Sequence, residues 1–286
     1  MPQKSRRRQL EYNAQFKRSF AFFARDFSCF KMTLRYSRYD PSILTARYFL
    51  QESWECMRIE IVQGSGPFAP DAGVHVVIDV IRAFTVAQVA FMGGASEIVL
   101  ARDKEQAFAL REVWTDSLLA GEIDGLAVPG FDLDNSPARM AKADVAGKSI
   151  IQMTTNGVKA AVQALFAEHV FVTGFSNARQ TALFVQTIEK KLKRPLVRLI
   201  ASHATSDDDL ACAEYMESIL TERQSFSAEA VAARIRASDV AQKFFDPARP
   251  EFDAEDIDWC AREISCSFVM RVTQRSEIPI VERVDV

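Results

Sequence analysis

The sequence predicts an α/β protein with a three-layer α/β/α fold around a largely parallel or mixed sheet. From Met57 onward, short β-branched runs alternate with helical stretches, as in βαβ units. The runs VVIDV, EIVLA, SIIQM, VFVTG and VRLIA are nearly all apolar, as expected of strands covered on both faces. All 11 glycines lie between Gly64 and Gly174, so the last 112 residues should be mainly helical.

The predicted strands are short and spread along the chain. They cover residues 58–62, 75–80, 97–101, 117–120, 149–153, 169–173 and 196–201. Helices are expected over residues 83–93, 103–114, 157–166, 176–191 and 207–222. A late strand at 278–284 should lie on a sheet edge, because Pro279 cannot donate a ladder hydrogen bond. Segments 78–100 and 151–173 share one strand–helix–strand order, which indicates either a duplication into two similar halves or two units obeying the same rules.

The composition excludes several classes of protein. Apolar residues make up 48% and charged residues 26% of the chain, which is typical of a globular protein, and a net charge of -3 argues against general nucleic-acid binding. No apolar run is long enough for a transmembrane helix. The five cysteines include no CxxC pair, so neither a zinc site nor a disulfide framework is predicted, and a cytoplasmic location fits best.

Residues 1–56 differ from the rest of the chain. They hold 11 Lys and Arg against 5 Asp and Glu, whereas residues 57–286 hold 24 against 33. One interpretation is an extension read from a misassigned start codon, with Met57 the real start. The alternative is a basic tail or docking arm. Residues 57–286 are expected to form the α/β domain.

Ligands of open α/β sheets bind beyond the carboxyl ends of the strands, so the residues following each predicted strand are the site candidates. Asp79 closes the second strand, and Arg82 follows in the turn. A carboxylate there can hold a divalent cation, and the arginine can fork onto a phosphate or sulfonate. The structural alternative is a salt bridge that caps the next helix.

The loop after the fourth strand, residues 121–137, is too long and too specialised for a plain connector. Its oxygen-bearing side chains could build a cation site: Glu122, Asp124, Asp132, Asp134 and Asn135. Ser136 is interpreted as the N-cap of a helix that begins at Pro137, in preference to a nucleophile, since no histidine lies near it in the sequence.

Two further turns place hydroxyl and amide side chains at a helix start. Thr154, Thr155 and Asn156 follow the fifth strand, and Gly157 would let backbone N–H groups approach an anion. Asn177 holds a similar position after the sixth strand. The alternative in both places is an ordinary helix cap.

Three aspartates open a helix after the seventh strand: Asp207, Asp208 and Asp209. The helix dipole alone accounts for acidic residues there, yet an acidic cluster opposite Asp79 would suit Mg²⁺. His203 would ligate, donate a proton or do neither. Only three histidines are present, which excludes histidine-rich catalysis, and no GxGxxG follows a strand, which disfavours a nucleotide-dependent oxidoreductase.

Several of these segments together resemble the 2-phosphosulfolactate phosphatase family of coenzyme M biosynthesis. The matching pieces are VIDVIRAFT at 77–85, AGE with PGFDLDNSP over 120–137, TTNG at 154–157, GFSNA at 174–178 and DLACAE at 209–214. The resemblance covers about residues 57–286. It implies a three-layer α/β fold, Mg²⁺ dependence and hydrolysis of a phosphate monoester of a sulfonated three-carbon acid.

Matching motif positions are held by Asp79, Arg82, Glu122, Asp132, Asn135, Ser136, Thr155, Asn156, Gly157, Asn177 and Asp209. The chain departs from the family pattern at Phe84, His203 and Glu214, and at Ile123, where the family usually has arginine. Loss of one cationic contact could cost on the order of a hundredfold in rate.

The leading hypothesis is a Mg²⁺-dependent phosphatase acting on a small phosphorylated (sulfo)carboxylic acid. Its predicted metal ligands are Asp79, Glu122 and Asp209, which act in catalysis with Arg82. Its predicted substrate-binding residues are Asn135, Ser136, Thr155, Asn156, Gly157 and Asn177. The alternative is a catalytically weakened phosphate- or anion-binding protein of the same fold. No nucleic-acid or membrane partner is expected. The sequence does not decide whether the chain forms a homo-oligomer.

The hypothesis has one spatial requirement. The loops that leave the strands at Val80, Ala120, Met153 and Ala201 must meet in a single acidic, anion-binding pocket.

Overall fold

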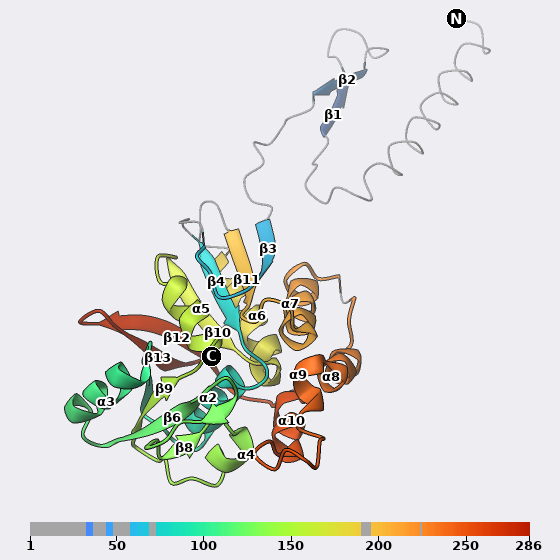
Figure 1. The fold of residues 1–286 in the computed structure, drawn as a ribbon. Helices are drawn as coiled ribbons and strands as arrows, with labels where there is room; N and C mark the ends of the chain where they lie inside the picture. The colour runs from blue at the N-terminus through green and yellow to red at the C-terminus, as the bar shows by residue number, and fades with distance from the viewer. Residues whose placement is uncertain (1–32, 37–43, 48–57, 69–72, 190–195, 224) are drawn as a thin grey trace, which may run out of the picture. The chain divides into compact units, whose positions relative to one another are not determined.

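The computed structural model describes residues 33–36, 44–47, 58–68, 73–189, 196–223 and 225–286 (Figure 1). The chain divides into two units, Met1–Cys56 and Met57–Val286. In the first unit, β1 (Thr33–Tyr36) pairs with β2 (Leu44–Arg47) in an antiparallel sheet. Most of this unit lies outside the described residues, so both interpretations of residues 1–56 stay predictions.

The second unit is built on one mixed sheet. Its main strands are β3 (Arg58–Gln63), β4 (Val74–Ile78), β5 (Glu97–Leu100), β6 (Ser117–Ile123), β9 (Ser149–Met153), β10 (His169–Thr173), β11 (Leu196–Ala201), β12 (Phe268–Arg275) and β13 (Ile278–Asp285). Two short strands, β7 (Leu126–Ala127) and β8 (Leu133–Asp134), pair with β6. The order across the sheet is β3-β11-β4-β10-β12-β13-β5-β9-β6-β7.

An antiparallel hairpin joins two parallel halves of the sheet. Strands β3, β11, β4 and β10 are parallel to one another, as are β5, β9 and β6. Between them, β12 pairs with β10 and β13 pairs with β5, both antiparallel. The three-layer α/β prediction with a mixed sheet is therefore confirmed.

Two expectations about the C-terminal region were wrong. Strand β12 lies in a stretch expected to be helical. Its residues Phe268, Met270 and Val272 pack in the core on one face of the sheet and Val269 packs in the core on the other, as a strand requires. Strand β13 lies inside the sheet and not at its edge. Pro279 is tolerated because the pairing with β5 involves only Ile280 and Val281, beyond the proline.

The sheet is covered by helices that follow the expected order. They are α2 (Ala83–Met92), α3 (Lys104–Val113), α4 (Pro137–Met140), α5 (Gly157–Gln163), the short 3₁₀ helix η1 (Phe175–Asn177), α6 (Ala178–Glu189), α7 (Asp207–Leu220), α8 (Ala228–Ala237), α9 (Asp239–Gln242) and α10 (Ala254–Cys260). Figure 1 shows α7 to α10 gathered at one side of this unit and α3 at the other. No helix among the described residues is long and apolar enough to cross a membrane.

Alternating strand residues supply the cores on the two faces of the sheet. In β4, Val76 and Ile78 pack in the cluster formed with α6 and α7, whereas Val77 belongs to the cluster formed with α2 and α5. In β9, Ile151 packs with the residues beneath α3. Because these strands are buried on both faces, their sequences read as continuous apolar runs.

The two similar segments connect the halves of the sheet. The unit β4–α2–β5 runs from one parallel half to the other, and β9–α5–β10 runs back. This path brings strand ends from both halves to the same region of the molecule.

Candidate functional site

Residues from four strand ends line one cavity of about 260 Å³. Seven of the candidate residues named from the strand ends and the 121–137 loop line it: Asp79, Arg82, Glu122, Asp124, Asn135, Thr155 and Asn156. They lie at the ends of β4, β6, β8 and β9 or in the turns that follow these strands, and His203, which follows β11, lines the same cavity. These loops therefore meet in one pocket, as required, whereas binding of an anion there stays a prediction.

Asp79 lies at the centre of a hydrogen-bond network. Its Oδ1 accepts the Ala83 N–H at 2.9 Å, the Ser202 hydroxyl lies 3.1 Å from its Oδ2, and the Gly157 N–H also points to this carboxylate. Burial raises the pKa of Asp79 to about 6, and the nearby Glu122 charge adds to the rise. A Cβ at position 157 would lie 2.6 Å from Asp79 Oδ2, so glycine is required for this approach.

Glu122 is fixed by the turns that follow β6 and β9. Its Oε1 accepts the Thr155 N–H at 2.6 Å, and its Oε2 accepts the Thr155 hydroxyl at 3.0 Å and the Gly125 N–H. Its 7% exposure leaves this carboxylate almost wholly within the protein. The interaction joins the two loops and holds the carboxylate at the cavity wall.

Asp209 and Asp208, at the start of α7, lie behind Asp79. The Oδ1 of Asp209 accepts the Val80 N–H at 2.8 Å, and the Ser202 hydroxyl lies 3.1 Å from its Oδ2 as well as from Asp79. Burial and neighbouring carboxylates raise the pKa of Asp209 well above its usual range and that of Asp208 to about 7. These residues therefore extend the acidic cluster inward from the cavity.

Arg82 lines the cavity and is held by a buried ion pair. Its Nη1 donates to Asp256 Oδ2 at 2.9 Å, its Nη2 donates to the Gly125 carbonyl at 3.0 Å, and its guanidinium lies 5.0 Å from the Phe244 ring centroid. The sequence also allows a salt bridge that caps the next helix. Arg82 does form a salt bridge, but its partner Asp256 belongs to α10, 174 residues away, and not to the next helix. Two of its five N–H donors are engaged in this way.

Asn135, Ser136 and Asn177 have different surroundings. Asn135 is 3% exposed, lines the cavity and has no partner for its Oδ1 among the described residues. Ser136 is the N-cap of α4, accepting the Arg139 N–H at 3.1 Å, and its hydroxyl donates to Asp256. Asn177 is buried, with its Oδ1 accepting the Thr173 hydroxyl at 2.7 Å. Neither Ser136 nor Asn177 is among the described residues that line the cavity.

Three residues of the helical C-terminal region complete the cavity wall: Val240, Lys243 and Phe244. Sequence reasoning did not identify them, nor Asp256, which anchors Arg82. No local motif marks these positions, because their contacts join α9 and α10 to turns more than a hundred residues earlier in the chain.

The cavity offers oxygen ligands of the kind that Mg²⁺ prefers. Among the described residues, no three His, Cys, Asp or Glu side chains converge as a ready metal-binding group. The oxygens of Asp79, Glu122 and Asp209 all accept hydrogen bonds within the protein, but Asp209 does not line the cavity. Asp79, Glu122 and the unpartnered Asn135 Oδ1 do line one cavity. Since Mg²⁺ sites use one or two carboxylates with waters and phosphate oxygens, this donor set fits the ion.

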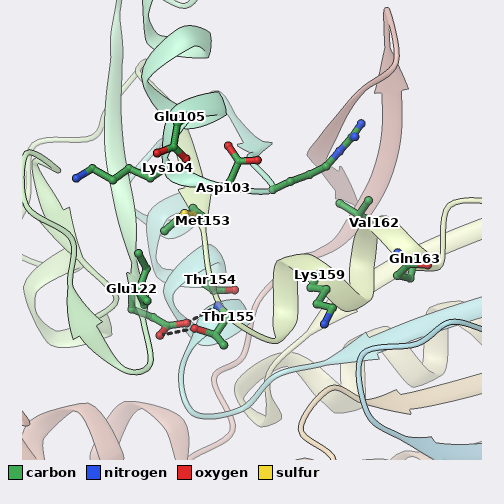
Figure 2. A pocket seen from close by; sticks show the side chains of 12 residues that line it. Asp103, Lys104, Glu105, Glu122, Met153, Thr154, Thr155, Lys159, Val162 and Gln163 are labelled. Carbon is green, nitrogen blue, oxygen red and sulfur yellow. Dashed lines mark hydrogen bonds between the residues drawn. The ribbon is translucent and has the colours of Figure 1, made fainter.

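A second cavity of about 500 Å³ adjoins the first (Figure 2). Glu122 and Thr155 line both cavities, and Figure 2 shows the hydrogen bonds that join them. Ile123, 48% exposed, faces this second cavity and not the first.

Residues 65–275 match the family model described as 2-phosphosulpholactate phosphatase. A Bacillus subtilis (strain 168) protein named probable 2-phosphosulfolactate phosphatase is 49% identical over 229 residues, which are 80% of this chain and 99% of the relative. A protein of the same name from Deinococcus radiodurans is 43% identical over 44% of this chain and 51% of its own length. One from Caldicellulosiruptor saccharolyticus is 32% identical over 51% of this chain and 62% of its own length.

Proposed function

This chain belongs to the 2-phosphosulfolactate phosphatase family, and from that premise we propose that it hydrolyses a phosphate monoester of a small (sulfo)carboxylic acid with the help of Mg²⁺. The first substrate to test is 2-phosphosulfolactate, which the names of its relatives specify. The products would be inorganic phosphate and the corresponding hydroxy acid.

One observation carries the proposal: the turns after β4, β6, β9 and β11 line a single cavity that contains carboxylate, amide and guanidinium groups. A phosphatase needs to hold an anionic ester and to balance the charge that develops on its oxygens during phosphoryl transfer. The cavity combines acidic residues for a cation with donors for a phosphate.

Asp79 and Glu122 would hold Mg²⁺, with Asn135 Oδ1 as a third oxygen donor. When bound, the ion would supply positive charge next to the phosphoryl oxygens. Asp209 orients this arrangement from behind, because it shares Ser202 with Asp79. The predicted role of Asp209 as a direct ligand is less well supported than that of Asp79 or Glu122.

The donors for the phosphoryl group would come from three turns. Arg82 has N–H groups beyond those bound to Asp256 and Gly125. Asn156 makes no side-chain cap bond to α5 and lines the cavity, which leaves its amide available to a ligand. The Gly157 N–H is directed at Asp79, so this glycine supports the site mainly by admitting the carboxylate.

The test is phosphate release from 2-phospho-3-sulfolactate, 2-phospholactate and p-nitrophenyl phosphate, each measured with Mg²⁺ and with EDTA. We expect Mg²⁺-dependent release, fastest with 2-phospho-3-sulfolactate. Tight binding of the esters without phosphate release would instead favour the catalytically weakened anion-binding protein. Equal rates with Mg²⁺ and after thorough chelation would refute the metal dependence.

A further inference from the structure

Lys243 is a cation of the cavity that comes from the helical C-terminal region and not from a strand end. It follows α9 directly and lines the same cavity as Asp79, Glu122 and Asn156. It is half-buried, so its long side chain lies against protein while its ammonium group faces the polar cavity.

Two aromatic rings and a glycine turn fix the position of this ammonium group. The Nζ lies 4.6 Å from the Phe252 ring centroid and 5.7 Å from that of Phe244. A Cβ at Gly125 would lie 3.0 Å from Lys243 Nζ, so the ammonium sits against the turn whose N–H binds Glu122. Cation–π contacts hold a positive charge in place without neutralising it.

Lys243 forms no ion pair within the described part of the chain, in contrast to its basic neighbours. Arg82 is paired with Asp256 at 2.9 Å, and Arg249, which also covers Phe252, is paired with Glu251 at 3.3 Å. Burial lowers the pKa of Lys243 and the charges of Arg82 and Arg249 lower it further, whereas the carboxylates of Glu122 and Asp208 offset part of this effect. An anionic group placed beside Lys243 would relieve this unfavourable environment.

The arrangement of the cavity indicates which part of the proposed substrate would supply this anionic group. The candidate phosphate donors belong to the turns after β4 and β9, whereas Lys243 approaches from the β6–β7 turn and α9. A small phosphorylated acid carries a second anionic group within a few bonds of its phosphate ester. A cavity of about 260 Å³ accommodates a molecule of that size.

We propose that Lys243 is a specificity-determining residue that binds the carboxylate or sulfonate of the substrate while the strand-end turns bind its phosphate. This inference rests on the proposed function of the same cavity. It predicts that Lys243 contributes to the selection of acidic phosphate esters over neutral ones, and that it contributes little to hydrolysis of an ester without a second acidic group.

The test compares wild type, Lys243→Met and Lys243→Arg on three esters in the full chain. We expect Lys243→Met to reduce kcat/KM at least tenfold for 2-phospholactate and 2-phospho-3-sulfolactate, mainly through KM, and to change p-nitrophenyl phosphate hydrolysis less than twofold. Lys243→Arg should restore most of the loss, since it keeps the charge. A larger effect on the sulfonated ester than on 2-phospholactate would assign the sulfonate to Lys243, and equal effects would assign the carboxylate.

Lys142→Met is the matched control, because Lys142 also contacts the C-terminal helices, through Glu255 at 2.9 Å, but does not line the cavity. It should leave all three rates unchanged. An equal loss on all three esters in Lys243→Met would overturn the proposal in favour of a general structural role. Unchanged kinetics on the acidic esters would overturn it as well.

A binding measurement separates this inference from the proposed function. Calorimetric titration with 3-sulfolactate, which has both acidic groups and no phosphate, does not require turnover. At least tenfold weaker binding to Lys243→Met than to wild type would support the assignment even if no ester were hydrolysed. Equal binding to the two proteins, or no measurable binding to wild type, would refute it.

Discussion

At the scale of single residues, the site is a set of buried carboxyl groups, and burial of their charged form is unfavourable in free energy. Asp79 and Asp208 have pKa values raised to about 6 and 7, mainly because burial disfavours the charged form. Backbone N–H groups and the Ser202 hydroxyl offset only part of that cost. The proposed cation, when bound, would offset more of it.

Replacement of Asp79 should separate activity from stability. We expect Asp79→Asn to lower Mg²⁺-dependent phosphate release about a hundredfold or more, while its thermal unfolding midpoint in EDTA stays equal to or above that of wild type, because a buried charge is removed. Asp132→Asn is the control, since Asp132 binds Arg111 and the Leu119 N–H outside the cavity. If Asp79→Asn kept full activity, Asp79 would have no part in the mechanism.

The Arg82–Asp256 ion pair should be important for stability as well as for the site. Its side chains are 4% and 1% exposed, so Asp256→Ala leaves a buried guanidinium without its partner and should cost about 3–5 kcal/mol of unfolding free energy. The exposed pair of Arg236 and Asp258, at 43% and 62%, provides the control, and Asp258→Ala should cost less than about 1 kcal/mol. Urea unfolding measures both, and similar losses in the two variants would contradict this assignment.

At the scale of elements, the strand-to-helix turns decide which groups meet. The turn from β9 into α5 places Thr155 against Glu122 and Gly157 against Asp79, so two strand ends of different halves are joined there. The motif at 154–157 lies at the strand-to-helix turn where the sequence placed it, whereas its binding of phosphate stays a prediction. What the sequence did not show is that the Gly157 N–H serves a carboxylate.

A methyl group at Gly157 should disturb the site directly. In Gly157→Ala the new Cβ would lie 2.6 Å from Asp79 Oδ2 and 2.9 Å from Ala83 Cβ, so Asp79 must move. We expect a loss of roughly ten- to a hundredfold in kcat/KM, because small displacements in a preorganised site have large effects.

Gly73→Ala is the matched control, because it introduces a similar steric clash away from the site. A Cβ at position 73 would lie 2.4 Å from the Leu196 carbonyl oxygen. This substitution should lower the thermal unfolding midpoint while the folded enzyme keeps its kcat. An equal kinetic loss in the two variants would show that Gly157 acts only through overall stability.

At the scale of the whole molecule, the cavity is lined by residues from both parallel halves of the sheet. Asp79 and His203 come from one half, and Glu122 and Thr155 from the other. Lys243 and Phe244, which follow α9, and Asp256 of α10 lie in the same region. Ligand binding should therefore stabilise the α/β unit as a whole.

Mg²⁺ should raise the thermal unfolding midpoint of the full chain. At a hundred times its Kd, an ion that binds only the folded state adds about 2.7 kcal/mol, which corresponds to roughly 5–10 °C for a unit of this size. Differential scanning calorimetry with Mg²⁺ and with EDTA measures the shift, and Asp79→Asn should abolish it. An equal shift in Asp79→Asn would place the ion elsewhere.

Much of the fold was predictable because its signals are local. The bounds of β9, β10 and β11 agree with the predicted strands, since apolar β-branched runs between polar turns are typical of strands buried on both faces. The candidate residues Asp79, Glu122 and Asn156 were found for a related reason: in a parallel sheet, the ends of the strands mark the ligand-binding edge.

The sequence by itself determined the α/β class, most strand and helix positions, the family resemblance and the side chains at the strand ends, because hydrophobic periodicity and turn chemistry act over a few residues. Only the tertiary structure decided that β12 and β13 separate the parallel halves, that Arg82 pairs with Asp256, and that Lys243 enters the cavity. The physical reason is that strand pairing and burial of charge depend on residues far apart in the chain, such as Arg82 and Asp256 at a separation of 174 positions.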